Sequence, residues 1–78
     1  MENEKKYREL FVEILGVNDD ELDNLEYMGV SGWDSLGHMN LIAGIEEAFD
    51  IMMDTDDIID FSSFKKGKEI LAKYDIEF

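Results

Sequence analysis

The residues most capable of chemistry lie in the stretch GWDSLGHMNL, residues 32–41, where Ser35 follows Asp34 at the expected start of a helix. A serine becomes a nucleophile when a neighbouring base takes its proton. The only histidine, His38, stands three residues further on, but it is expected to project toward the core. The string reads G-x-x-S-x-G, one residue too long for a nucleophile elbow, and no strand precedes it. Without a third group or an oxyanion hole, the sequence argues against self-contained catalysis.

A metal site is the second chemistry to consider, because the stretch DTDDIID, residues 54–60, is rich in aspartate. Asp54 and Asp56 occupy alternate positions, as in a calcium-binding loop. Ile58 and Ile59, however, stand where the next ligand and the required glycine belong. The chain also has no cysteine, so it offers no thiolate of its own. The sequence therefore predicts weak cation binding by an acidic surface and no dedicated metal site.

The charge of the chain restricts its partners. Twenty Asp and Glu residues against seven Lys and Arg give a formal net charge of −13. Residues 9–64 contain no Lys or Arg, so the middle of the chain is an acidic block. Nucleic acid and anionic membranes are excluded as expected partners, and a basic protein surface is favoured.

Length and composition predict one small folded domain over residues 1–78. A chain of this size has room for one modest core and no roomy catalytic cavity. Its hydrophobic content of 45% is high enough to fold despite the charge. No apolar run is typical of a secretory signal or a membrane span. We therefore expect a cytoplasmic, monomeric protein.

The spacing of apolar residues predicts an all-α bundle of three main helices and one short one. We expect helices over residues 3–15, from 34 or 35 to 49 or 50, and over 63–74, with a short helix capped by Asp54 or Thr55. A long loop with at most one helical turn follows Gly16, which is a plausible stop. Leu22, Leu25 and Met28 are predicted to pin this loop to the core.

The second helix carries two apolar faces. One face is predicted to join the core, and the opposite face carries Leu36, Met39 and Ala43 with acidic residues beside it. Scattered apolar residues on a surface need no special explanation. Because Ser35 stands at the head of this second stripe, we favour a docking surface for a basic partner. The predicted core face consists of Leu41, Ile42, Ile45, Ala48 and Phe49.

Several segments together resemble the acyl carrier protein family of phosphopantetheine-binding carriers, in its stand-alone form. They are DSL at the start of the acidic second helix, the run LIAGIEEAFDI, and the later DIIDFSSFKKGKEIL. The match extends from the first helix to Tyr74. D-S-L alone is frequent by chance, but the order of helices and the acidity add to it. The resemblance implies that Ser35 receives 4'-phosphopantetheine, which a phosphopantetheinyl transferase takes from coenzyme A.

The resemblance also implies roles for other residues. Asp34 would cap the helix and help the transferase and its magnesium engage the serine. The transferase and the acyl-loading, condensing or acyl-transfer enzymes would contact Leu36, Met39, Asn40, Ala43, Glu46 and Glu47. Between visits, the acyl cargo would lie among Leu25, Ile42, Ile58 and Phe61.

The sequence leaves the pathway open. Gly37 and Asn40 stand where carriers of fatty acid synthesis usually have acidic residues, which puts recognition by the ordinary synthase in doubt. The pattern is more similar to stand-alone carriers of specialised pathways, although fatty acid and polyketide synthesis stay open. Trp33 is interpreted as a packing residue or, less favoured, as a partner contact. The alternatives are an aminoacyl or peptidyl carrier and an unmodified acidic adaptor in which Ser35 is only a helix cap.

Overall fold

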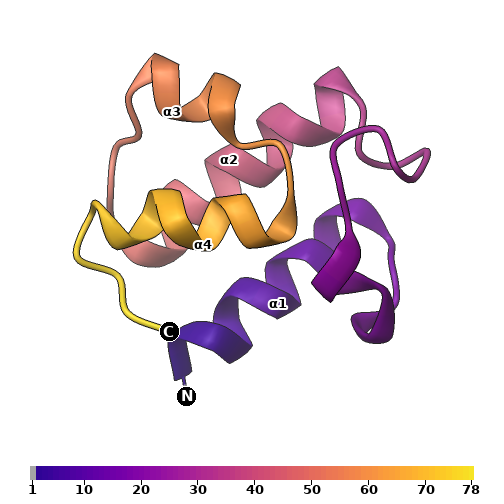
Figure 1. Ribbon diagram of the computed structural model, residues 1–78, viewed down its shortest axis with the longest axis horizontal. Coiled ribbons are helices and arrows are strands. Elements are labelled where there is room, and N and C mark those ends of the chain that lie inside the picture. Colours follow the sequence, from indigo (N-terminus) through magenta and orange to yellow (C-terminus); the bar gives the residue numbers. More distant parts are fainter. Residues whose placement is uncertain (1) are drawn as a thin grey trace.

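The computed structural model describes residues 2–78 and confirms the predicted all-α bundle (Figure 1). Its elements are α1 (Glu2–Leu15), the 3-10 helix η1 (Asp19–Asn24), α2 (Ser35–Phe49), α3 (Thr55–Asp60) and α4 (Phe64–Ala72). Within residues 2–78 no regular β-strand forms, and one isolated antiparallel bridge joins Glu26 to Ser63. The two ends of the described chain meet where the Asn3 side chain donates to the Glu77 carbonyl.

The helix α1 is amphipathic, with one buried face. Tyr7, Phe11 and Leu15 recur every four residues and are all buried. The helix ends as predicted at Gly16, which adopts the left-handed conformation with a φ of 70°. The Gly16 N–H donates to the Val12 carbonyl at 3.1 Å and so closes the last turn.

The helix α2 begins and ends with aspartates in special conformations. At its start, the Asp34 carboxylate accepts a hydrogen bond from the Gly37 N–H at 2.8 Å, which confirms the predicted N-cap. At its end, Asp50 adopts the left-handed conformation with a φ of 55°, and its N–H donates to the Glu46 carbonyl. Of the predicted core face, Leu41, Ile42 and Ile45 are buried, and Ala48 and Phe49 are half-buried.

The last helix is shorter than predicted. Ser63 caps α4 by accepting from the Lys66 N–H at 2.9 Å, but the helix ends at Ala72 and not at Tyr74. The chain turns there because Asp75 adopts the left-handed conformation, with a φ of 66°, and Ile76 folds back into the core. Burial of Ile76 therefore competes with continuation of the helix.

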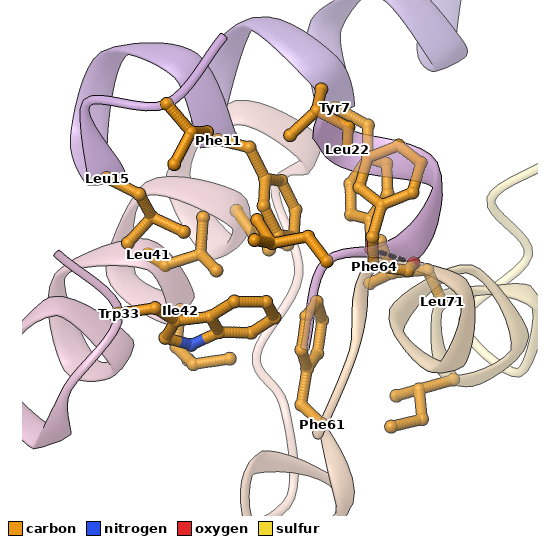
Figure 2. Packing of buried hydrophobic residues seen from close by; sticks show 14 of the residues in the cluster. Tyr7, Phe11, Leu15, Leu22, Trp33, Leu41, Ile42, Phe61, Phe64 and Leu71 are labelled. Carbon is orange, nitrogen blue, oxygen red and sulfur yellow. Dashed lines mark hydrogen bonds between the residues drawn. The ribbon is translucent and has the colours of Figure 1, made fainter. Parts of the chain in front are cut away.

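The core is an aromatic cluster between α1, α4 and the loop before α2. Figure 2 shows Phe11, Trp33 and Phe61 directed toward one another, and their ring centroids are 5.4–6.4 Å apart. Tyr7 and Phe64 complete the cluster, with centroids 4.8 Å apart. The buried Tyr7 hydroxyl donates to the Phe64 carbonyl at 2.7 Å. Trp33 has no exposed surface, so its predicted packing role is confirmed.

The loop between α1 and α2 is pinned to the core by two of the three predicted residues. Leu22, within η1, and Leu25, directly after it, are buried. Met28 was expected to join them, but this prediction is wrong, because Met28 is 64% exposed. Its backbone is left-handed, with a φ of 68°, and its N–H donates to the Trp33 carbonyl at 2.9 Å. This tight turn leaves the Met28 side chain in solvent.

Candidate functional site

Ser35 is the first residue of α2 and its side chain is exposed. The N–H groups of a first helical turn have no partner within the helix, and the helix dipole places partial positive charge there. Asp34 takes up one of these groups, the N–H of Gly37. The Ser35 hydroxyl lies 3.5 Å from the Tyr27 hydroxyl, with either oxygen able to donate. The arrangement presents an accessible hydroxyl at a position that favours an attached anion.

Two glycines hold the start of α2 against the rest of the bundle. A Cβ atom on Gly37 would lie 2.0 Å from the Gly32 carbonyl oxygen. A Cβ atom on Gly32 would in turn lie 2.2 Å from the carbonyl oxygen of Leu15, the last residue of α1. The backbones therefore stack directly, from the end of α1 through Gly32 to the first turn of α2. This close approach explains why Gly37 replaces the acidic residue expected from the resemblance.

His38 is fixed between two hydrogen-bond partners. The Trp33 indole N–H donates to Nδ1 of His38 at 3.0 Å, and Nε2 of His38 lies 2.8 Å from the Ile58 carbonyl oxygen. An indole N–H can only donate and a carbonyl can only accept. The imidazole is therefore neutral, with its proton on Nε2. Both ring nitrogens are engaged, so neither can accept the proton of Ser35.

An apolar groove of about 330 Å³ opens beside Ser35, between the first turns of α2 and the end of α3. Ile58 and Ile59 of α3 form one wall, and Met39 of α2 lies on the other side. The full lining consists of Tyr27, Ser35, His38, Met39, Ile58, Ile59, Phe61 and Ser62.

The structure divides the predicted acyl-binding set. Ile58 and Phe61 line the groove, but Leu25 and Ile42 do not. Leu25 is 6% exposed and Ile42 is 1% exposed, because both are packed in the core. Sequence reasoning missed Tyr27 and Ser62 as lining residues, since the Tyr27 N–H reaches the Ser62 carbonyl only across the fold.

The outer face of α2 is exposed where a docking surface was predicted. Leu36 is 71% exposed and Met39 is 55% exposed, and Asn40, Ala43 and Glu47 are exposed beside them. Glu46 differs from the others. It is half-buried, and its carboxylate accepts from the Met53 N–H at 2.9 Å. Glu46 therefore fastens the loop after α2, whereas the others are free for a partner.

The groove wall α3 is held to the turn that follows α4 by a polar clamp around Asp57. Lys73 Nζ lies 2.5 Å from one carboxylate oxygen of Asp57, and the Tyr74 hydroxyl donates to the other at 2.6 Å. The Tyr74 oxygen also accepts from the Asp54 N–H at 2.9 Å. The hydrogen bond from Lys73, followed by that from Tyr74, lowers the pKa of Asp57 below its ordinary value. In the described part of the chain, no group of His, Asp and Glu side chains is arranged to hold a metal ion.

The site fits a covalently attached phosphopantetheine. Such a group needs an exposed hydroxyl, a position favourable to a phosphodiester, and space along the surface for the arm. Ser35, the N-terminus of α2 and the neighbouring groove provide these three features. When attached, the group supplies a thiol, which a chain without cysteine cannot supply itself.

Comparison with known proteins agrees with this chemistry. Residues 6–66 match the family model described as the phosphopantetheine attachment site, which covers most of the chain. No curated protein matches the chain. Among residues 2–78, no helix has the length and apolar character that crossing a bilayer requires. The chain belongs to the phosphopantetheine attachment-site family and is an all-α carrier that bears a covalent 4'-phosphopantetheine.

Proposed function

We propose that Ser35 is the residue to which the 4'-phosphopantetheine is attached. The observation that supports this assignment is an exposed hydroxyl at the N-terminus of α2, on the rim of an apolar groove and inside the matched residues 6–66. Asp34 caps the helix and so fixes the direction of the serine. Through the resemblance, Asp34 also helps a transferase and its magnesium engage the hydroxyl.

The protein then acts as an acyl carrier that performs no reaction on its cargo. Thioesters on the arm are presented to enzymes that load, condense or transfer acyl groups in fatty acid, polyketide or other specialised synthesis. Aminoacyl or peptidyl groups are chemically possible cargo, because they attach through the same thioester. Carriers of fatty acid synthesis usually have acidic residues where this chain has Gly37 and the neutral Asn40. The smaller number of negative charges near Ser35 favours a specialised pathway.

The exposed face of α2 is proposed as the surface on which the transferase and the acyl-handling enzymes dock. Leu36 and Met39 offer apolar area, and Glu47 with the surrounding acidic block attracts basic residues. Weak and rapid binding suits a carrier that visits several enzymes in turn. Ile59, which is 72% exposed on the far wall of the groove, is proposed to extend this surface.

Modification of Ser35 is tested by incubating the protein with coenzyme A and a promiscuous phosphopantetheinyl transferase, followed by intact-mass measurement. We expect one phosphopantetheinyl group per chain, and none on Ser35→Ala. Ser62→Ala is the matched control, because Ser62 is an exposed hydroxyl that lines the same groove. Loss of modification in Ser62→Ala but not in Ser35→Ala would reassign the attachment. Absence of modification with several transferases would favour the unmodified acidic adaptor.

The docking face is tested by the kinetics of the same reaction. Leu36→Ala is expected to raise the KM of the transferase for the carrier by about tenfold, since loss of 1–2 kcal/mol of apolar contact has that effect. Met52→Ala is the control, because Met52 is 85% exposed but follows the other end of α2. Equal KM values for the two variants would contradict docking through Leu36.

A further inference from the structure

His38, one of the residues that line the groove beside Ser35, stands on α2 directly before a turn that belongs to the core. His38 lines the groove, and Ile42 lies one turn further along the same face of α2. Ile42 is 1% exposed and does not line the groove. The interior between α2 and α3 is therefore closed behind His38, although a path in that direction would lead directly to the core.

The imidazole is held in this position by contacts on several sides. Besides its hydrogen bonds to Trp33 and Ile58, the ring lies nearly parallel to the Trp33 indole, with an interplanar angle of 19° and centroids 6.2 Å apart. Phe61 and Tyr27 meet it edge to face, with centroids 6.0 and 5.3 Å away. A side chain with so many partners has few other positions to adopt.

Displacing His38 would leave the indole N–H of Trp33 without its partner. Trp33 is fully buried, so water cannot replace the lost acceptor. A buried donor that loses its partner bears the full cost of its desolvation. Outward movement of α3 is opposed as well, since Asp57 on that helix is bound to Lys73 and Tyr74. Both routes into the core therefore require broken hydrogen bonds.

We propose that His38 closes the groove toward the core, so that this carrier holds its acyl group in the surface groove and excludes a long alkyl chain from its interior. The inference rests on the proposed attachment at Ser35. It confines the cargo to the surface groove, whose volume is about 330 Å³.

The test compares cargo of different length on the whole chain. The transferase is supplied with the acetyl, butyryl and dodecanoyl derivatives of coenzyme A, and intact mass verifies each product. The measurements are the NMR resonances of the Trp33 indole N–H and of the Ile42 methyl groups, together with the melting temperature. In the unsubstituted protein we expect these resonances to be the same in all three forms, and the dodecanoyl form to melt no higher than the acetyl form.

Two variants at position 38 sharpen the test. His38→Ala removes the barrier, so its dodecanoyl form is expected to shift the Ile42 methyl resonances and to melt above its acetyl form. His38→Gln is the matched control, because a glutamine amide can accept from the indole and donate to the Ile58 carbonyl. It is expected to behave as the unsubstituted protein does. If His38→Ala fails to fold, the unsubstituted protein alone decides the question.

The possible failures are distinct from one another. Dodecanoyl cargo that shifts the Trp33 and Ile42 resonances of the unsubstituted protein would overturn the closure by His38, while the gain in mass would still support attachment. Absence of any gain in mass, or its persistence in Ser35→Ala, would instead overturn the attachment at Ser35 and the inference with it.

Discussion

The helices α1 and α3 are attached to the bundle in different ways. The helix α1 buries a continuous apolar face of Tyr7, Phe11 and Leu15. In α3, the buried residue is a carboxylate, Asp57, while Ile58 is half-buried and Ile59 is 72% exposed. Hydrogen bonds from Lys73, Tyr74 and His38 secure α3, whereas α1 adds ion pairs at its surface, such as that of Glu4 with Lys68, to a large buried apolar face.

Because of this difference, the free energy of folding and the shape of the groove depend on different contacts. Apolar burial is non-directional, so the packing of α1 against its aromatic neighbours stabilises the fold without depending on the exact positions of individual polar atoms. Polar contacts are directional and sensitive to charge, so the attachment of α3 can be changed one group at a time. Because α3 forms a wall of the groove, such changes reach the site while leaving the core intact.

The largest effect is expected on the α1 side, from Phe11→Ala. Phe11 has no exposed surface and contacts the rings of Tyr7, Trp33 and Phe64. Loss of a buried phenylalanine side chain should lower the free energy of unfolding by about 3–5 kcal/mol, measured by urea denaturation. Ile59→Ala, on the exposed surface of α3, should change it by less than about 0.5 kcal/mol. Similar losses in both variants would contradict the difference between the two helices.

A smaller loss in the free energy of unfolding is expected from Gly37→Ala. In an open helix this change would add about 0.5–1 kcal/mol of stability. Here the new methyl group would meet the backbone oxygen of Gly32, which cannot move without shifting the end of α1. We therefore expect the opposite sign, a loss of about 1–3 kcal/mol in urea denaturation.

Gly44→Ala is the control for this prediction, because Gly44 lies in the same helix. Its added methyl group would meet Cδ1 of Ile14 at 2.7 Å, the far end of a flexible side chain. We expect a change smaller than that of Gly37→Ala. Equal changes in the free energy of unfolding would show that the close backbone contact with Gly32 does not make Gly37 more sensitive to substitution than Gly44.

The polar attachment of α3 should make the stability of the protein depend on pH in acid, and Asp57→Asn tests this. The pKa of Asp57 is lower in the folded protein than its ordinary value of 3.8, chiefly because Lys73 donates to it. The carboxylate therefore stabilises the fold at pH values above 3.8, and this contribution is lost as the pH falls through the lowered pKa. In Asp57→Asn that part of the acid dependence should disappear.

Hydrogen exchange measured residue by residue locates the effect. At neutral pH, Asp57→Asn should speed exchange in α3 while leaving the amides near Phe11 in α1 unchanged. Asp56→Asn is the matched control, since Asp56 is the exposed neighbour in the same helix. Faster exchange throughout the molecule would mean that the Asp57 clamp supports the whole fold and not α3 alone.

The sequence predicts well what depends on neighbouring residues. The spacing of Tyr7, Phe11 and Leu15 indicates α1, and the Asp34 cap with the exposed Ser35 follows from the local pattern at the start of α2. Gly16 ends α1 where expected. In each case the interaction joins residues within about one or two helical turns, so one segment contains the whole signal.

What the sequence does not reveal depends on contacts between distant segments. Nothing near Glu46 indicates that it accepts from Met53 across a turn, and nothing near His38 indicates Ile58, 20 residues away. The sequence also does not reveal that Leu25 and Ile42 are absent from the groove lining, because periodicity shows which face of a helix is apolar but not which of its residues are sealed in the core. The only signal in the sequence for a groove at this place is that Trp33 and His38 flank Ser35.

The smallest expected effect is that of salt, and it concerns the acidic surface on the α3 side. With a net charge of −13, screening by added sodium chloride or magnesium should reduce repulsion and raise the melting temperature. Since 1 kcal/mol shifts the melting temperature of such a domain by about 4–8 °C, the rise should be a few degrees. Calorimetry at increasing ionic strength measures it.

A charge variant shows whether the repulsion is concentrated around α3. Asp56 and Asp60 are exposed on that helix, close to Asp54 and Asp57 in sequence, so the double variant Asp56→Asn, Asp60→Asn should reduce the rise caused by salt. Asp20→Asn, Glu21→Asn is the control, because it removes the same charge from η1. Equal responses would place the repulsion over the whole surface. A flat melting temperature in every variant would contradict the prediction that charge repulsion destabilises the fold.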